Sequence, residues 1–114
     1  MNLHELTKYQ NEFQENHGWI LADLEGDDLM KKLLFMTVAL AGELGEFANL
    51  VKKMERIRER KKAYDKDYLP MLKEELTDVF IYLINVCILL GIDLEKEYLN
   101  KMEKNKIKFK EFEV

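Results

Sequence analysis

The sequence predicts an all-α protein. Two long segments carry apolar residues at alternating steps of four and three, which is the spacing of a stripe along one side of a helix. The 114 residues include only five glycines and one proline, so few turns are expected. No segment of useful length alternates with a period of two, as a half-buried strand would. We therefore expect four helices packed like a four-helix bundle, in a single domain over residues 1–114.

The first helix is expected near residues 2–16, and an irregular connection follows it. Apolar residues recur in this segment at helical spacing: Leu3, Leu6, Tyr9 and Phe13. The connection, HGWILADLEGDD, occupies residues 17–28. Asp27 or Asp28 at its end can cap the next helix by accepting a hydrogen bond from a free backbone N–H group.

The second helix is expected over residues 28–60 and carries the most regular apolar stripe in the chain. The stripe runs through Leu29, Leu33, Met36, Leu40, position 43, Phe47, Leu50 and Met54. This spacing predicts that one side of the helix faces other helices. The charged run ERIRERKK at 55–62 is typical of a solvated helix end, and AYDKDYLP at 63–70 breaks the pattern.

The third helix is expected to begin near Tyr68–Pro70, because proline is tolerated in the first turn, and to end at Gly91. Its stripe runs through Leu72, Leu76, Val79, Leu83, Val86 and Leu90. Asp93 can then cap a fourth helix that extends to about Lys106.

The third helix is apolar on nearly every side from Val79 to Leu90. A lone bundle of this size cannot cover such a helix completely. Either it is a well-covered central helix, or part of it packs against another copy of the chain. We favour the second interpretation, which predicts a homo-oligomer.

Composition and charge exclude several classes of protein. The net charge of −4 disfavours binding to a nucleic acid polymer, which would call for a basic surface. The longest apolar run, at 79–90, is shorter than the roughly 20 residues of a membrane span. One cysteine, Cys87, rules out an intrachain disulfide, and the first sixteen residues contain no apolar run typical of a signal peptide. We therefore expect a cytoplasmic protein that does not enter a membrane.

One position in the second helix breaks its apolar stripe. Position 43 should be apolar and is Glu43, and Glu46 follows on the same side of the helix. Gly42 and Gly45 flank this carboxylate, although each costs about 1 kcal/mol relative to alanine inside a helix. These glycines suggest that something approaches the backbone closely. Because an uncompensated buried charge is unfavourable, a metal ion or a cationic partner is expected nearby.

The third helix supplies a second pair of carboxylates, Glu75 and Asp78, beside its own stripe. Either pair alone would indicate no more than a solvated face. If the second and third helices pack antiparallel, however, both pairs can face each other and bring four oxygen donors into one small volume. Such hard donors suit Mg²⁺ or Mn²⁺ and lack the soft ligands that zinc prefers.

The order of these carboxylates resembles a known family. The pattern E-x-x-E on one helix and E-x-x-D on the next is similar to the MazG-type all-α nucleoside triphosphate pyrophosphohydrolases. The segment KMEKNKIKF resembles the family's late K-x-x-x-N segment, and HGW at 17–19 precedes the long helix as in several members. The resemblance spans residues 13–110. Its matching site residues are Glu43, Glu46, Glu75, Asp78, Lys101 and Asn105.

This resemblance implies a fold, a reaction and a cofactor. The expected reaction is Mg²⁺-dependent cleavage between the α and β phosphates of a nucleoside triphosphate, giving a nucleoside monophosphate and pyrophosphate. By the same resemblance the four carboxylates bind Mg²⁺, and Lys101 and Asn105 contact phosphate. Glu46 is our candidate for the group that accepts a proton from the attacking water.

The sequence departs from the family where the base is expected to bind. Many relatives specific for pyrimidine deoxynucleotides carry a tryptophan shortly after E-x-x-E, whereas this chain has ANLVKKMER there. Trp19 is an alternative stacking platform, or else a lid over the core of the second helix. Further candidates for substrate contact are Lys53, within the departing stretch, and Lys108, which follows the late segment.

A second class of function stays open at this point. The chain can also be a non-enzymatic, oligomeric helical interaction module, in which the RIRERKK run at 56–62 serves as a docking patch for an anionic partner. Affinity for divalent metal distinguishes the two hypotheses, because an interaction module has no need of it.

Overall fold

The structure is a computed structural model, and it describes residues 1–61 and 68–114. The described residues form four α-helices, a short 3₁₀ helix and no strand. In chain order these are α1 (Leu3–Asn16), α2 (Gly26–Lys61), α3 (Leu69–Leu90), α4 (Leu94–Lys108) and η2 (Lys110–Phe112). The prediction of an all-α fold is confirmed. The expected break at 63–70 falls largely outside the described residues, as does Lys62 of the charged run.

Two of the expected helix ends are formed by the residues that the sequence indicates. The Asp93 side chain accepts a hydrogen bond from the backbone N–H of Lys96 at 3.2 Å and caps α4. Gly91 ends α3 in the left-handed conformation, with a φ of 64°, which side chains with a Cβ rarely adopt. The chain turns there without strain, and this sets where α4 departs.

One local prediction is wrong, and a second finds no support within the described residues. Neither Asp27 nor Asp28 caps α2, because the helix already begins at Gly26 and places both in its first turn. Their charges are still favourable there, since the helix dipole is positive at this end. A Cβ atom at Gly42 or Gly45 would meet no atom of the described residues within 4 Å, so no described segment of this chain approaches the backbone closely at those glycines.

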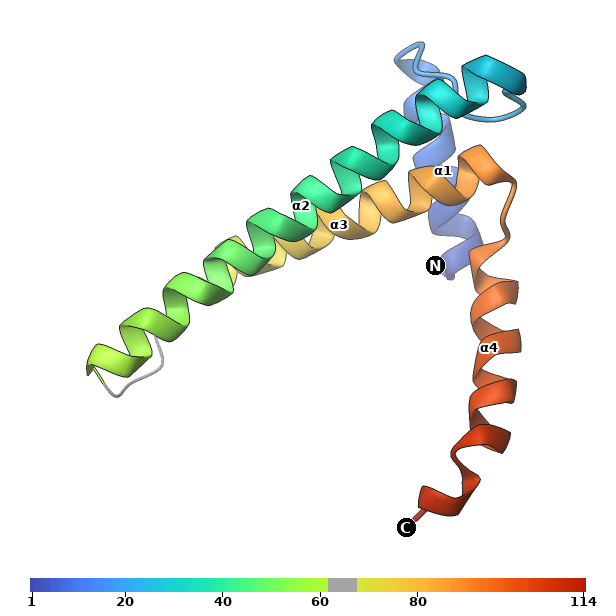
Figure 1. Cartoon of the computed structure of the whole chain (residues 1–114). Coiled ribbons are helices and arrows are strands. Elements are labelled where there is room, and N and C mark those ends of the chain that lie inside the picture. The colour runs from blue at the N-terminus through green and yellow to red at the C-terminus, as the bar shows by residue number, and fades with distance from the viewer. Residues whose placement is uncertain (62–67) are drawn as a thin grey trace.

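The helices form an open arrangement in which only α2 and α3 run side by side, antiparallel (Figure 1). Helix α1 crosses this pair at its upper end and contacts α3. Helix α4 turns away from α3 at an angle of 100°. The bundle-like packing within one chain therefore involves α2, α3 and α1, while α4 contacts α1 and otherwise projects away.

The most deeply buried cluster lies where the connection after α1 meets the start of α2 and the end of α3. Leu21 is fully buried and packs with Met36 and Leu89. Residues packed around these three include Leu24, Leu29, Tyr82, Val86 and Ile88. Cys87 is also buried, as a free thiol whose pKa is raised by desolvation. This cluster holds the connection after α1 against the α2–α3 pair.

The two predicted apolar stripes have different outcomes. Every apolar member of the α2 stripe is buried or half-buried, so this stripe does face neighbouring helices. On α3 the prediction is partly wrong, because Leu76, Leu83 and Leu90 are exposed. An apolar helix has no polar side to mark which face turns inward, and α3 buries Ile84 and Leu89 instead.

Helix α2 also leaves an apolar face uncovered. Met30, Leu34 and Val38 follow one another at steps of four, and Leu34 is 66% exposed. Helix α2 is long and apolar enough to cross a membrane by length and composition. However, the same helix carries Glu43 and Glu46 near its middle, and ionised side chains at such a depth are costly in lipid.

We predict that these exposed apolar residues of α2 and α3 pack against a second copy of the chain, because an uncovered apolar face of this kind typically marks an interface. Light scattering during size exclusion at micromolar concentration should give at least a dimer without detergent. Leu34→Glu should shift the protein to a smaller species, whereas Lys61→Glu at the charged end of α2 should not. A wild-type monomer, or solubility only in detergent, would contradict the prediction.

Candidate functional site

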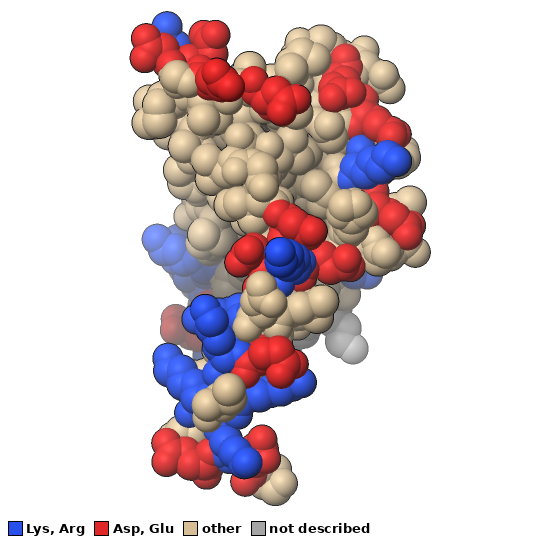
Figure 2. All heavy atoms as spheres, turned by 90° about the vertical axis from the view of Figure 1, so that its right-hand side faces the viewer, with Lys and Arg blue, Asp and Glu red and all other residues tan. Residues whose placement is uncertain are grey.

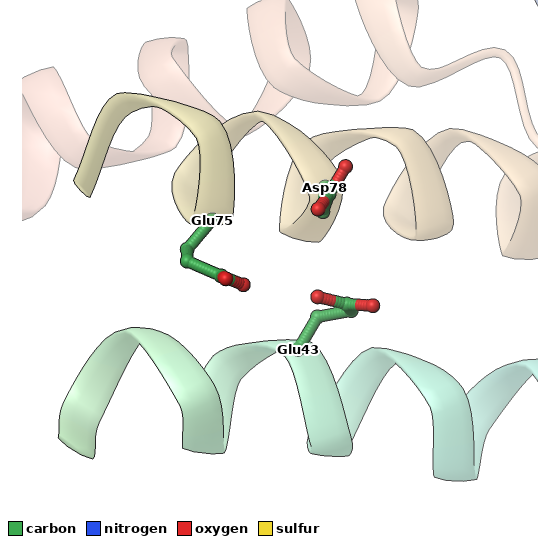
Figure 3. Close-up of side chains that lie close together, drawn as sticks. All are labelled: Glu43, Glu75 and Asp78. Carbon is green, nitrogen blue, oxygen red and sulfur yellow. The ribbon is translucent and has the colours of Figure 1, made fainter. Parts of the chain in front are cut away.

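Three carboxylates meet between α2 and α3. Glu43 comes from α2, and Glu75 and Asp78 come from α3; one oxygen of each lies within 4.8 Å of the others. Figure 3 shows the Glu43 and Glu75 side chains pointing toward each other across the space between the helices, with Asp78 beside them. All three are half-buried. Three of the four carboxylates named from the sequence are therefore brought together.

The local helix geometry explains this convergence. Glu43 occupies a stripe position that faces α3, so its side chain points between the helices instead of into solvent. Glu75 and Asp78 are three residues apart, which places them on the same side of α3, one turn from each other. Because α2 and α3 run antiparallel, the two sets of side chains meet from opposite sides.

The cluster is electrostatically unfavourable without a cation. Among the described residues, Oε2 of Glu43 and Oε2 of Glu75 are buried and have no hydrogen-bond partner. Burial, and then repulsion from Glu46 and Asp78, raises the pKa of Glu43. A hydrogen bond with Glu46, together with burial and the nearby negative charges, raises the pKa of Glu75 to about 7.

Glu46, the fourth carboxylate, lies one helical turn beyond Glu43 and stands apart from the tight group of three. Its side chain is exposed and interacts with Glu75. It lines a cavity of about 280 Å³ together with Glu75 and Lys53. Lys53, a candidate from the sequence, is therefore in the same cavity as two of the carboxylates.

A larger cavity, of about 700 Å³, opens on the other side of the cluster. Glu43 and Asp78 line it, and so does Trp19. Its wall includes aromatic and amide side chains from three helices, among them Tyr9, Gln10, Phe13, Gln14, Phe35, Tyr82 and Asn85. Trp19 is 52% exposed and stacks on His17 with ring centroids 4.9 Å apart, so it stands at the edge of this cavity and does not close over the core.

The candidates on α4 are not brought to the carboxylates of the same chain. Lys101, Asn105 and Lys108 lie on the helix that turns away from α3, and they line neither of the two cavities. Figure 2 shows Lys and Arg side chains gathered over the lower part of the molecule, where α4 lies. Within one chain, α4 is thus a basic projection away from the acidic cluster.

The amide side chains of the larger cavity were not identified from the sequence. Asn85 lies within the run VFIYLINVCILL, which was interpreted only as core. A signal was present: Asp78, Tyr82 and Asn85 are four and three residues apart and therefore share one side of α3. Gln10 and Gln14 on α1 are likewise four apart.

The residues present fit a divalent cation. Three carboxylates offer oxygen donors within a few ångströms of one another, and two of their oxygens have no other partner. Hard oxygen donors of this kind suit Mg²⁺ or Mn²⁺, with water and substrate completing the coordination. Such an ion would remove the repulsion that raises the pKa values of Glu43 and Glu75.

Comparison with known proteins agrees with this geometry. A family model of the MazG nucleotide pyrophosphohydrolase domain matches residues 31–110, which include all of the carboxylates. The chain belongs to this family. A curated relative, dCTP pyrophosphatase 1 from Rattus norvegicus, is 31% identical over 74 residues, which are 65% of this chain and 44% of that protein. The chain thus spans less than half the length of this relative. The resemblance inferred from E-x-x-E and E-x-x-D is confirmed at the level of the family.

We predict that the metal-free protein loses stability as pH rises from about 4.5 to about 7. Glu43 and Glu75 have raised pKa values in the folded state. The folded protein therefore keeps protons that the unfolded chain releases in this pH range, and the free energy of unfolding falls as pH rises. Thermal unfolding in the presence of a chelator should therefore give a lower Tm at pH 8 than at pH 5.5. Glu43→Gln removes one of the repelling charges, so the Tm of this variant should fall less between pH 5.5 and pH 8 than the Tm of the wild type.

We also predict that Mg²⁺ offsets this loss. An ion present at 100 times its dissociation constant adds about 2.7 kcal/mol to the free energy of unfolding if it binds only the folded state. The Tm at pH 8 should rise with Mg²⁺ and return to its starting value with chelator, and Glu43→Gln should weaken the response. A wild-type protein that does not respond to Mg²⁺ or Mn²⁺ would argue against a metal site at these carboxylates.

Proposed function

We propose that the protein is a Mg²⁺-dependent nucleoside triphosphate pyrophosphohydrolase that cleaves the bond between the α and β phosphates. The products are a nucleoside monophosphate and pyrophosphate. The observation that carries this proposal is the group formed by Glu43, Glu75 and Asp78, which lies between a large aromatic cavity and a smaller one containing a lysine. Membership of the MazG family supports the same reaction.

The acidic cluster acts on the phosphates through a cation. Mg²⁺ held there would neutralise charge on the triphosphate and make a bound water a better nucleophile. The chain itself holds the ion with Glu43, Glu75 and Asp78, and the proposal adds Glu46 as a fourth ligand. Glu46 is also the proposed proton acceptor, because it is the most exposed of the four and interacts directly with Glu75.

The two cavities suggest how the substrate lies. The nucleoside occupies the cavity of about 700 Å³, where Trp19 offers an aromatic face for the base. The departing β and γ phosphates lie toward the smaller cavity, where Lys53 supplies a positive charge. The α phosphate then sits at the carboxylates, between the two. The name of the rat relative makes dCTP the first triphosphate to test.

The lysines of α4 enter this proposal through a second copy of the chain. Lys101, Asn105 and Lys108 project away from the acidic cluster of their own chain, and α4 carries a concentration of lysines. In a homodimer or homotetramer, α4 of one subunit can reach the acidic cluster of another and contact its phosphates. A cytoplasmic location fits the proposal, since nucleoside triphosphates are found there and Cys87 is a free thiol.

The alternative is an oligomeric interaction module without catalysis. This alternative explains the exposed apolar faces of α2 and α3 as well as the enzyme hypothesis does, because both include oligomerisation. It gives no reason for two unpaired carboxylate oxygens to be held between packed helices, where their desolvation is unfavourable. We therefore retain the enzyme as the proposal.

We predict that Glu43→Gln and Asp78→Asn lower the rate of pyrophosphate release by about 100-fold or more, because loss of a metal ligand should exceed the effect of losing a residue that only supports one. Purified protein should be assayed with Mg²⁺ and a panel of nucleoside triphosphates that includes dCTP, with monophosphate and pyrophosphate both measured. Lys61→Glu, far along α2, should retain wild-type rates. Release of inorganic phosphate in place of pyrophosphate would contradict the proposed bond cleavage.

Glu43→Leu should separate activity from stability. Leucine completes the apolar stripe of α2 and removes a half-buried charge, so the metal-free Tm should rise while pyrophosphate release is lost. A structural role for Glu43 predicts the reverse, with stability lost. Full activity in Glu43→Leu would overturn the assignment of this residue as a metal ligand.

Lys101→Ala should weaken substrate binding and leave the response of Tm to Mg²⁺ unchanged, because its proposed partner is a phosphate of the substrate. The expected result is a higher KM with a Mg²⁺ titration like that of the wild type. Mixing Lys101→Ala with Glu43→Gln should restore part of the activity if α4 acts on a neighbouring subunit. If subunit exchange is verified and mixing restores no activity, Lys101 does not act at the acidic cluster of a neighbouring subunit.

A further inference from the structure

The larger cavity has a polar inner wall and an aromatic edge. Asn85 and Gln14, which line it, are only 2% and 6% exposed, whereas Phe35 is 63% exposed. Burying an amide without hydrogen-bond partners is unfavourable, so a polar wall at this depth needs a reason. Apolar side chains would fill the same positions more favourably if the wall served only to hold the helices together.

Two of these amides are already joined to each other. Nε2 of Gln10 on α1 donates a hydrogen bond to Oδ1 of Asn85 on α3, at 3.2 Å. The bond uses one donor of the first amide and the acceptor of the second. It leaves Oε1 of Gln10 as an acceptor and Nδ2 of Asn85 as a donor. Reversing both amides also leaves one donor and one acceptor, so the pair offers both kinds of group in either orientation.

The pair lies at a defined distance from the acidic cluster. Asn85 follows Asp78 by seven residues on the same side of α3, which is about 10.5 Å along the helix axis. Both residues line the same cavity. A nucleotide with its α phosphate at the carboxylates and its base in this cavity would therefore place the hydrogen-bonding edge of the base near the amides.

We propose that the Gln10–Asn85 amide pair recognises the hydrogen-bonding edge of the base and sets which base the enzyme prefers. This inference rests on the proposed function. Each base presents an amino or a keto group beside a ring nitrogen, and an adjacent donor and acceptor form the complement of such an edge. In a given orientation the free donor and the free acceptor have fixed places, so the pair then distinguishes bases that carry an amino group, such as cytosine, from bases that carry a keto group at the same position, such as uracil.

The decisive variant is Asn85→Asp, assayed with dCTP and dUTP because these two substrates have the same size. A carboxylate accepts hydrogen bonds from the amino group of cytosine and repels the keto oxygen of uracil. The ratio of kcat/KM for dCTP to that for dUTP should rise by about tenfold or more, the usual effect of one mismatched hydrogen bond to a charged group. Asn2→Asp is the matched control, because it adds the same charge at the exposed N-cap of α1 and preserves the cap.

A second variant covers the case in which Asp at buried position 85 unfolds the protein. Gln10 is only half-buried, so Gln10→Leu should fold while removing the partner of Asn85. The same ratio should then move toward one. A fall in kcat/KM by the same factor for both substrates, in either variant, would show that the amides act only in packing and would overturn the inference. A wild-type ratio already near one would do the same.

Binding without turnover separates this inference from the proposed function. The affinities of dCMP and dUMP for the wild type and for Asn85→Asp can be measured by calorimetry with Mg²⁺ present, because a monophosphate has no phosphoanhydride bond to cleave and the cation offsets its repulsion by the carboxylates. A change in relative affinity toward dCMP supports base recognition by the pair even if no triphosphate is hydrolysed, in which case only the proposed reaction fails. Equal affinities in both proteins, alongside normal hydrolysis, would overturn the inference and leave the reaction standing.

Discussion

The arrangement of this protein depends on negative charges held between two packed helices. Glu43, Glu75 and Asp78 repel one another, and two of their oxygens have lost water without gaining a hydrogen bond. The apolar contacts along α2 and α3 must hold these groups in place against that repulsion. A cation reverses the balance, because the same oxygens then become ligands. Under the proposed function the site would therefore be least stable when empty, and the cation and a bound triphosphate would each reduce the repulsion suffered by the other.

Much of this site could be predicted from the sequence because it disturbs a regular pattern. Glu43 stands where the stripe of α2 calls for an apolar residue, and a single such exception is visible without a structure. Glu75 and Asp78 were linked to it through their helical spacing and the expectation that neighbouring helices pack antiparallel. Helix order and the end of α3 at Gly91 were predictable for a similar reason, since each rests on a local signal.

What could not be predicted depends on contacts between elements. Helix α3 is apolar all round, so its sequence does not determine which side meets α2, and half of its expected stripe is exposed. Gly91 marks where α3 ends but carries no information about the direction of α4. The role of Asn85 could not be predicted for a different reason. A single amide in an apolar run draws attention only when the structure shows its hydrogen bond with Gln10, which lies 75 residues earlier in the chain.

Helix α1 contributes to the larger cavity, yet it precedes the matched family region, which begins at residue 31. The clustered carboxylates lie on α2 and α3, whereas part of the wall of the larger cavity comes from α1, a separate element that crosses this pair. Helix α1 thus adds Gln10 to the proposed base pocket without supplying a carboxylate, whereas Asn85 of the same pair shares α3 with Glu75 and Asp78. If the base binds as proposed, a change confined to α1 would alter which nucleotide is accepted without touching a clustered carboxylate, and exchange of a single fourteen-residue helix would then be a route to new substrates.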